Sequence, residues 1–100
     1  MQDISLKELH DDQFILLDVR TLEEFQSGHI SRANNIDFFS EDFIDKIKEF
    51  DTSLNLIIYC RSDNRSSKSA KILLEYDYKN IFVLKGGIEE WISQGNPVTF

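Results

Sequence analysis

Cysteine and proline each occur once in this 100-residue sequence, and glycine occurs four times. The single cysteine, Cys60, has no partner for a disulfide within the chain, which agrees with a reducing compartment. No repeat, low-complexity tract or Pro/Gly-rich linker is present. No apolar run approaches the roughly 18 residues that read as a membrane span. We therefore expect residues 1–100 to form one globular domain, with a monomer as the default.

Positive charge is also scarce, since 11 Lys and Arg face 18 Asp and Glu and the formal net charge is −7. Such an acidic chain is a poor binder of nucleic acid or of an anionic membrane. Residues 1–12 carry acids where a signal peptide would be basic and then apolar, so we expect a cytoplasmic location. Cys60, His10 and His29 are too scattered for a zinc spacing, and the sequence predicts no metal and no cofactor.

Four short segments have the composition of β-strands. Residues 14–19 (FILLDV) and 54–60 (LNLIIYC) are near-continuous apolar runs, as in strands buried on both faces. Residues 81–84 (IFVL) predict a third strand, and residues 33–36 (ANNI) predict a short one.

Amphipathic segments lie between and after these strands. Residues 21–28 begin with Thr21 as N-cap and Glu24 as its capping-box partner, and Gly28 is the expected stop. Three further helices are predicted over residues 40–50, 65–77 and 86–95. Ser40 is the expected N-cap of the first. The residues expected to face the core are Phe43, Ile44, Ile47 and Phe50, then Ala70, Leu73, Leu74 and Asp77, then Ile88, Trp91 and Ile92.

The alternation of strands and helices predicts an α/β fold, with a mainly parallel sheet and helices on both faces. Such folds bind ligands beyond the carboxyl ends of their strands. Asp18 and Arg20 stand at the end of one predicted strand, and Cys60 stands at the end of another. This convergence marks Cys60 as a candidate functional residue.

The loop after Cys60 places a thiol beside two arginines and a helix start. A cysteine reacts as its thiolate, and inward-pointing amides at a helix N-terminus stabilise an anion. Arg61 and Arg65 are candidate contacts to an oxyanion, with Lys68 in support, so the local charge is expected to be basic. The alternative is a small buried hydrophobic cysteine beside a solvated loop.

Three segments in the right order resemble the rhodanese homology domain, over nearly the whole chain. They are LLDVRTLEEFQSGHISRANNI, YCRSDNRSSKSA and LKGGIEEWISQGNPV. The first is similar to the family's N-terminal signature and the second to its active-site loop. The third is similar to its C-terminal signature. The resemblance implies a three-layer domain with a mainly parallel five-stranded sheet.

By the same resemblance, Cys60 is the nucleophile of a sulfurtransferase. It would take a sulfane sulfur from a donor such as thiosulfate, hold it as a persulfide, and pass it to cyanide or a thiol, including a protein thiol. The residues that would bind the substrate are Arg61, Ser62, Asp63, Asn64, Arg65 and Ser66. Since the chain has no resolving cysteine, release of the sulfur requires an external acceptor.

Two positions depart from the family pattern. Asp63 stands where glycine is common, so its backbone would be strained if the position needs a positive φ. Its carboxylate, placed near the sulfur, would raise the thiol pKa and repel anionic donors. A carboxylate that points outward, or pairs with Arg61 or Lys68, would have only a small, screened effect. Ser31 and Arg32 replace the usual proline and glycine in a connector, where we expect only a local effect on rigidity.

Several other polar residues have structural interpretations. Asp18 is expected to brace the loop from behind by accepting hydrogen bonds from loop amides or an arginine, and Arg20 to pair with Glu24. His29 is a candidate general base, but a backbone hydrogen bond is the favoured role.

Two rival functions remain open from the sequence. A noncatalytic rhodanese-fold module would bind a protein partner and lack a reactive thiol. A small phosphatase would use the same nucleophile, but related cell-cycle phosphatases carry one more residue in the loop than the Cys60–Arg65 spacing. Neither the physiological donor nor the acceptor is evident.

Overall fold

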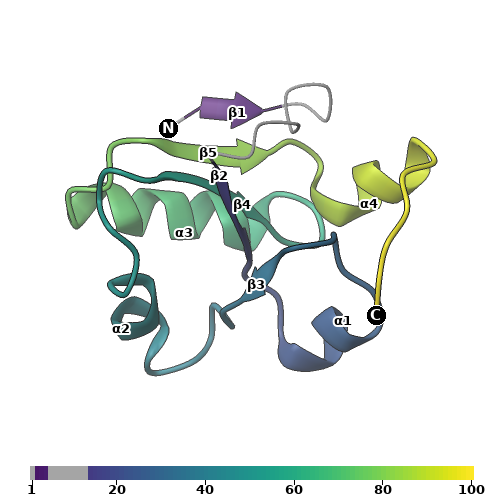
Figure 1. The fold of residues 1–100 in the computed structure, drawn as a ribbon, viewed down its shortest axis with the longest axis horizontal. Helices are drawn as coiled ribbons and strands as arrows, with labels where there is room; N and C mark the ends of the chain where they lie inside the picture. The colour runs from purple at the N-terminus through teal and green to yellow at the C-terminus, as the bar shows by residue number, and fades with distance from the viewer. Residues whose placement is uncertain (1, 5–13) are drawn as a thin grey trace.

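The computed structural model describes residues 2–4 and 14–100. From β2 onward, strands and helices alternate along the chain (Figure 1). In order they are β1 (Gln2–Ile4), β2 (Phe14–Asp18), α1 (Leu22–Gln26), β3 (Asn34–Asn35), α2 (Phe43–Ile47), β4 (Asn55–Tyr59), α3 (Asn64–Glu75), β5 (Ile81–Leu84) and α4 (Gly87–Ser93).

The strands form one five-stranded sheet in the order β1-β5-β4-β2-β3, and every pair is parallel. This confirms the predicted α/β class. The composition of the sequence indicated only four of these strands, and the fifth is β1 at the edge beside β5. The central strand β4 pairs with β2 from Phe14↔Asn55 to Asp18↔Tyr59. The carboxyl ends of β2 and β4 are therefore neighbours.

The side chains of β4 alternate between two apolar layers, as a strand buried on both faces requires. Leu56 and Ile58 pack with residues of α2 and α3, whereas Ile57 and Tyr59 pack with Ile88 of α4. Helices therefore cover both faces of the sheet, and the three-layer arrangement is confirmed.

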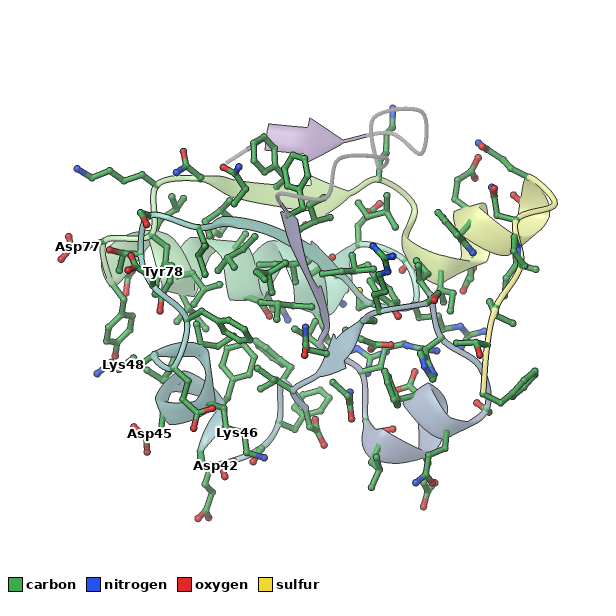
Figure 2. The ribbon with its side chains drawn as sticks, in the orientation of Figure 1. Asp42, Asp45, Lys46, Lys48, Asp77 and Tyr78 are labelled. Carbon is green, nitrogen blue, oxygen red and sulfur yellow. The ribbon has the colours of Figure 1, made fainter. Side chains whose placement is uncertain are left out.

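Tyr78, between α3 and β5, fixes the C-terminal end of α2 (Figure 2). Its buried hydroxyl lies 2.9 Å from the carbonyl oxygen of Ile47 and 2.7 Å from that of Phe50. The end of α2 is thus held against the layer that contains α3. Its exposed side carries the i,i+4 pair of Asp42 and Lys46.

The helix predicted over residues 40–50 is shorter than expected. Asp42 is the N-cap of α2 and makes no side-chain capping bond. The hydroxyl of Ser40, the expected N-cap, donates to the Asp42 carboxylate instead. After Ile47 the chain tightens into three-residue turns, with the Phe50 amide donating to the Ile47 carbonyl.

The helix predicted over residues 65–77 begins at Asn64 and ends at Glu75. Asp77, expected to face inward, has φ +70 and is exposed, and the Tyr78 amide donates to the Leu73 carbonyl. The left-handed Asp77 and the hydrogen bond from Tyr78 back to Leu73 end the helix in a Schellman motif. Leu74 and Ile92, also predicted to face the core, are exposed. In the described part of the chain, no helix is long and apolar enough to cross a bilayer.

Candidate active site

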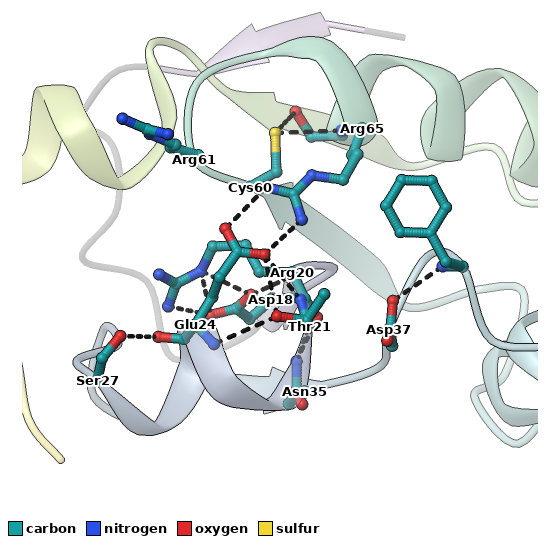
Figure 3. A network of polar contacts seen from close by, with 12 residues as sticks. Asp18, Arg20, Thr21, Glu24, Ser27, Asn35, Asp37, Cys60, Arg61 and Arg65 are labelled. Atoms are coloured by element: carbon teal, nitrogen blue, oxygen red, sulfur yellow. Dashed lines mark hydrogen bonds and ion pairs between the residues drawn. The ribbon is translucent and has the colours of Figure 1, made fainter.

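Cys60 follows β4 directly and lies under the loop that leads to α3 (Figure 3). The residue is 1% exposed. Its Sγ atom lies 3.4 Å from the backbone nitrogen of Ser66, which donates to it, and 3.4 Å from the Ser66 hydroxyl oxygen. Ser66, predicted to be a site residue, therefore contacts the sulfur from the first turn of α3.

The loop turns its carbonyl groups toward α4. The Ile88 amide donates to the Cys60 carbonyl at 3.0 Å, and the Glu89 amide donates to the Arg61 carbonyl at 3.1 Å. In a trans peptide the next N–H points opposite to the carbonyl, so the N–H groups of Arg61 and Ser62 point away from α4. In the described part of the chain, no protein atom accepts a hydrogen bond from the amides of residues 61–65.

The close approach of α4 to the loop depends on Gly87. Its φ is +60, and a Cβ atom there would lie 2.7 Å or less from the carbonyl oxygens of Cys60, Arg61 and Ser62. Any larger residue would therefore push the loop and α4 apart. From the sequence, Gly86 and Gly87 are expected to permit the turn into this helix. The contact of Gly87 with three loop carbonyl groups arises only in the folded chain.

Asp63 is accommodated without backbone strain. Its φ is −135, so this position does not need the left-handed conformation that glycine favours. The Oδ1 atom accepts a hydrogen bond from the Gly86 amide at 2.9 Å. The carboxylate thus ties the middle of the loop to the turn before α4.

Each of the two loop arginines is paired with a carboxylate from a different element. Arg65 forms two hydrogen bonds with Glu24 of α1, at 2.6 and 2.9 Å, and Arg61 donates to Glu89 of α4 at 2.7 Å. Arg61 is exposed, with 73% of its side chain accessible. The sequence-based expectation of a locally basic loop did not take into account that Glu24 and Glu89 pair with these two arginines.

Glu24 also closes the capping box at the start of α1, as predicted. The Thr21 amide donates to Glu24, and the Glu24 amide donates to the Thr21 hydroxyl. The hydrogen bond from Arg65, followed by that from the Thr21 amide, lowers the Glu24 pKa to about 2 despite partial burial. The Arg65 pKa is raised, chiefly by the same bond to Glu24.

Arg20 pairs with Asp18, and the expected pairing with Glu24 is wrong. The guanidinium contacts both Asp18 carboxylate oxygens, at 2.7 to 3.1 Å, and donates to the Gly28 carbonyl at 2.7 Å. Both residues are buried. Asp18 thus accepts from an arginine, as one of the two predicted alternatives, and Arg20 connects the end of β2 to the end of α1.

His29 has the backbone role that the sequence favoured. Its Nδ1 atom donates to the Phe25 carbonyl at 3.0 Å, and its ring stacks on Phe25 at 3.7 Å between centroids. Its own backbone forms an antiparallel bridge with Thr99. These contacts fix the chain after α1, and they give His29 a structural role.

The structure gathers the predicted site residues only in part. Cys60 and Ser66 are in contact, whereas the side chains of Arg61, Asp63 and Arg65 are bound to other elements. Ser62 is exposed on the loop, and Asn64 is exposed at the start of α3. The site combines a buried thiol, the Ser66 N–H group that donates to it, and loop N–H groups that have no protein acceptor in the described part of the chain. Such a combination suits an anion beside a nucleophilic sulfur.

These features define a cysteine-loop domain on a parallel α/β sheet. The chain belongs to the family described as the rhodanese-like domain, whose model matches residues 2–94. The resemblance drawn from the three sequence segments is thereby confirmed.

Several known proteins are similar to this chain. Thiosulfate sulfurtransferase 16, chloroplastic, from Arabidopsis thaliana is 33% identical over 81% of this chain and 76% of its own length. Thiosulfate:glutathione sulfurtransferase from Saccharomyces cerevisiae is 29% identical over 86% of this chain and 70% of its own length. The tRNA uridine(34) hydroxylase of Cytophaga hutchinsonii is 35% identical over 84% of this chain, but only 28% of that protein is covered.

The fold is shared with solved structures. The rhodanese-related protein of Thermoplasma volcanium superposes with a TM-score of 0.86 and 28% identity, and the match covers 99% of this chain and 98% of that one. The sequence relatives include both sulfurtransferases matched over most of their length and larger proteins with other named activities, of which only a part is matched.

Proposed function

We propose that this protein is a sulfurtransferase that carries sulfur on Cys60 as a persulfide. The observation that carries the proposal is the position of the Cys60 sulfur below a loop whose amides, in residues 61–65, have no protein acceptor in the described part of the chain. Two relatives named as sulfurtransferases, matched over most of their length, support it.

The first half-reaction loads the cysteine. The Cys60 thiolate attacks the outer sulfur of thiosulfate, a new S–S bond forms, and the S–S bond of the donor breaks. Sulfite leaves with the electron pair of that bond, and Cys60 holds the transferred sulfur as a persulfide anion. The amides of residues 61–65, together with that of Ser66, supply the donors for this charge.

The second half-reaction unloads the cysteine. A thiolate or cyanide attacks the outer sulfur of the Cys60 persulfide, and the Cys60 thiolate is the leaving group. Since Cys60 is the one cysteine of the sequence, no intramolecular disulfide discharges the persulfide. The acceptor is therefore an external small thiol, a protein thiol or cyanide, and the kinetics are ping-pong.

The test is intact mass spectrometry after incubation with thiosulfate and removal of excess donor. The wild-type chain should gain one sulfur atom, and subsequent cyanide should remove it with formation of thiocyanate. Cys60→Ser should gain none. A second substitution, Ser67→Ala, alters a half-buried residue one step beyond the contact to the sulfur and should leave the gain intact.

Results of this assay separate the rival functions. A noncatalytic binding module would gain no sulfur from any donor, although it would keep the fold. A phosphatase would instead hydrolyse an aryl phosphate in a Cys60-dependent manner. Hydrolysis without any sulfur loading would overturn the sulfurtransferase proposal.

A further inference from the structure

The charged side chains around the Cys60 loop are arranged so that neither arginine acts as an unpaired cation. Glu24 binds Arg65 with both carboxylate oxygens, and the pair joins α1 to α3 (Figure 3). Glu89, in the first turn of α4, holds Arg61 from the other side of the loop. A bidentate carboxylate satisfies the donors with which a guanidinium would bind an oxyanion.

The loop itself adds a further acid. The Asp63 carboxylate accepts a hydrogen bond from the Gly86 amide, and it forms no ion pair with any cation of the described residues. Two arginines therefore face three carboxylates, counting Asp63, Glu24 and Glu89. Lys68 of α3 and Lys85, just before α4, are exposed, so solvent and salt screen their fields.

We propose that Glu24 and Glu89 are specificity-determining residues. They lower the kcat/KM of Cys60 loading for doubly charged donors relative to that for persulfides of small thiols. This inference rests on the sulfurtransferase function proposed above. It assigns to the two glutamates the choice of donor, whereas Cys60 and the loop amides perform the transfer.

The physical basis is that the Coulomb energy between a carboxylate and a donor grows with the donor's charge. Thiosulfate brings two negative charges to the site. A persulfide reacts as R–S–SH, which carries no charge on its outer sulfur. The backbone N–H groups still stabilise the product anion in both cases, so the glutamates penalise thiosulfate selectively.

The persulfide reaction balances without any further reagent. The Cys60 thiolate forms a bond to the outer sulfur of R–S–SH, and the S–S bond of the donor breaks. The departing thiolate takes the proton of the outer sulfur and leaves as R–SH. Cys60 retains the sulfur as a persulfide anion, the same species that thiosulfate would form.

The experiment compares loading of Cys60 by thiosulfate with loading by the persulfide of 2-mercaptoethanol, in wild type, Glu24→Gln and Glu89→Gln. The readout is the ratio of the two kcat/KM values, because an altered thiolate population affects both donors and cancels. Glutamine preserves the capping box of α1. Glu75→Gln, at the exposed far end of α3, changes the net charge by the same amount and is the matched control.

For Glu24→Gln, the ratio should shift about three- to tenfold in favour of thiosulfate, as expected when one negative charge is removed from the surroundings of a dianion. The shift for Glu89→Gln should be about two- to threefold, since its pair with Arg61 is exposed. Both shifts should shrink at high salt, and Glu75→Gln should show none.

Other outcomes are decisive in different ways. If wild type loads sulfur but neither glutamine variant moves the ratio, or all three move it equally, the inference about Glu24 and Glu89 is wrong and the proposed function stands. If no donor loads Cys60, both fail. Thermal unfolding of each variant verifies that the loop remains folded, and Glu89→Gln keeps the test open if Glu24→Gln does not fold.

Discussion

The carboxylate of Glu24 accepts hydrogen bonds from two elements that are far apart in the sequence. Its Oε1 atom receives the Thr21 amide at 3.0 Å and the Arg65 guanidinium at 2.6 Å, while Oε2 receives Arg65 at 2.9 Å. One residue thus starts α1 and anchors it to α3. Because α1 itself buries none of its side chains fully, this anchor matters for its position.

Replacing Glu24 with glutamine should make stability depend less on pH. The folded-state pKa of about 2 lies below the usual 4.5, so the stabilisation is present above pH 4.5 and is lost as the pH falls through 2. The shift sets an upper limit of about 3 kcal/mol, and 32% exposure of the side chain reduces the expected loss in Glu24→Gln to about 1–2 kcal/mol at pH 7.

Urea unfolding of both proteins between pH 7 and pH 2 measures this difference. The free energies of unfolding should converge toward pH 2. A gap that stays constant over the whole range would mean that the Arg65 ion pair is not its cause. Glu23→Gln, at the exposed neighbouring position, should show no comparable gap.

At the scale of elements, the loop and α4 form one unit. The N-terminal amides of α4 bind the carbonyls of Cys60 and Arg61, and Asp63 binds the turn that precedes the helix. Since these contacts fix one side of each peptide plane, they also fix where the opposite N–H groups point. The orientation of the loop amides therefore depends on α4, which lies distant in sequence from Cys60.

Gly87→Ala should disrupt this unit. The added Cβ would collide with three loop carbonyl oxygens, which should cost about 1–3 kcal/mol beyond the strain of a positive φ and slow sulfur loading about tenfold or more. Gly95→Ala is the matched control, because Gly95 has φ +82 but nothing within 4 Å of its Cβ position.

Chemical denaturation and the loading rate should both separate the two variants. Gly95→Ala should lose only about 1 kcal/mol, the cost of a left-handed alanine, and should load sulfur at the wild-type rate. Equal losses in both variants would show that backbone strain, and not the close contact with the loop, accounts for the effect of Gly87→Ala.

At the scale of the whole molecule, the net charge of −7 acts on every donor that approaches. An acidic protein repels a dianion over distances that salt shortens, and it affects an uncharged donor little. The sheet places the Cys60 loop beyond the ends of β4 and β2, between α1 and α4, and both helices carry a glutamate that pairs with an arginine of the site.

Salt should therefore accelerate loading from thiosulfate. Between about 10 and 150 mM ionic strength, kcat/KM should rise about two- to fivefold, whereas it should change much less for the persulfide of 2-mercaptoethanol, which carries at most one negative charge. Rapid-quench measurement of the sulfur gained by Cys60, read by intact mass at constant pH, provides the comparison for both donors. A decrease with salt would reveal an attractive local field at the loop, contrary to the pairing of its arginines.

The sequence-based predictions were accurate for features that local interactions decide, and they failed for features that depend on contacts with distant parts of the chain. Strand β5 was predicted over its observed range, and the capping box of Thr21 and Glu24 was confirmed, because local propensity and spacing decide both. Strand β1 was missed, since its three residues gain their strand identity by pairing with β5. Asp77 was misplaced because a left-handed residue, not hydrophobic periodicity, ends α3.

The sequence by itself determined the family, the parallel α/β layers and the place of Cys60 at the end of a buried strand, because these depend on short-range patterns. Only the tertiary structure decided which carboxylates bind Arg61 and Arg65, where Asp63 turns, and why Gly87 must stay small. Those features join residues that are distant along the chain, and the partners of a charged side chain are set by the elements that packing brings beside it.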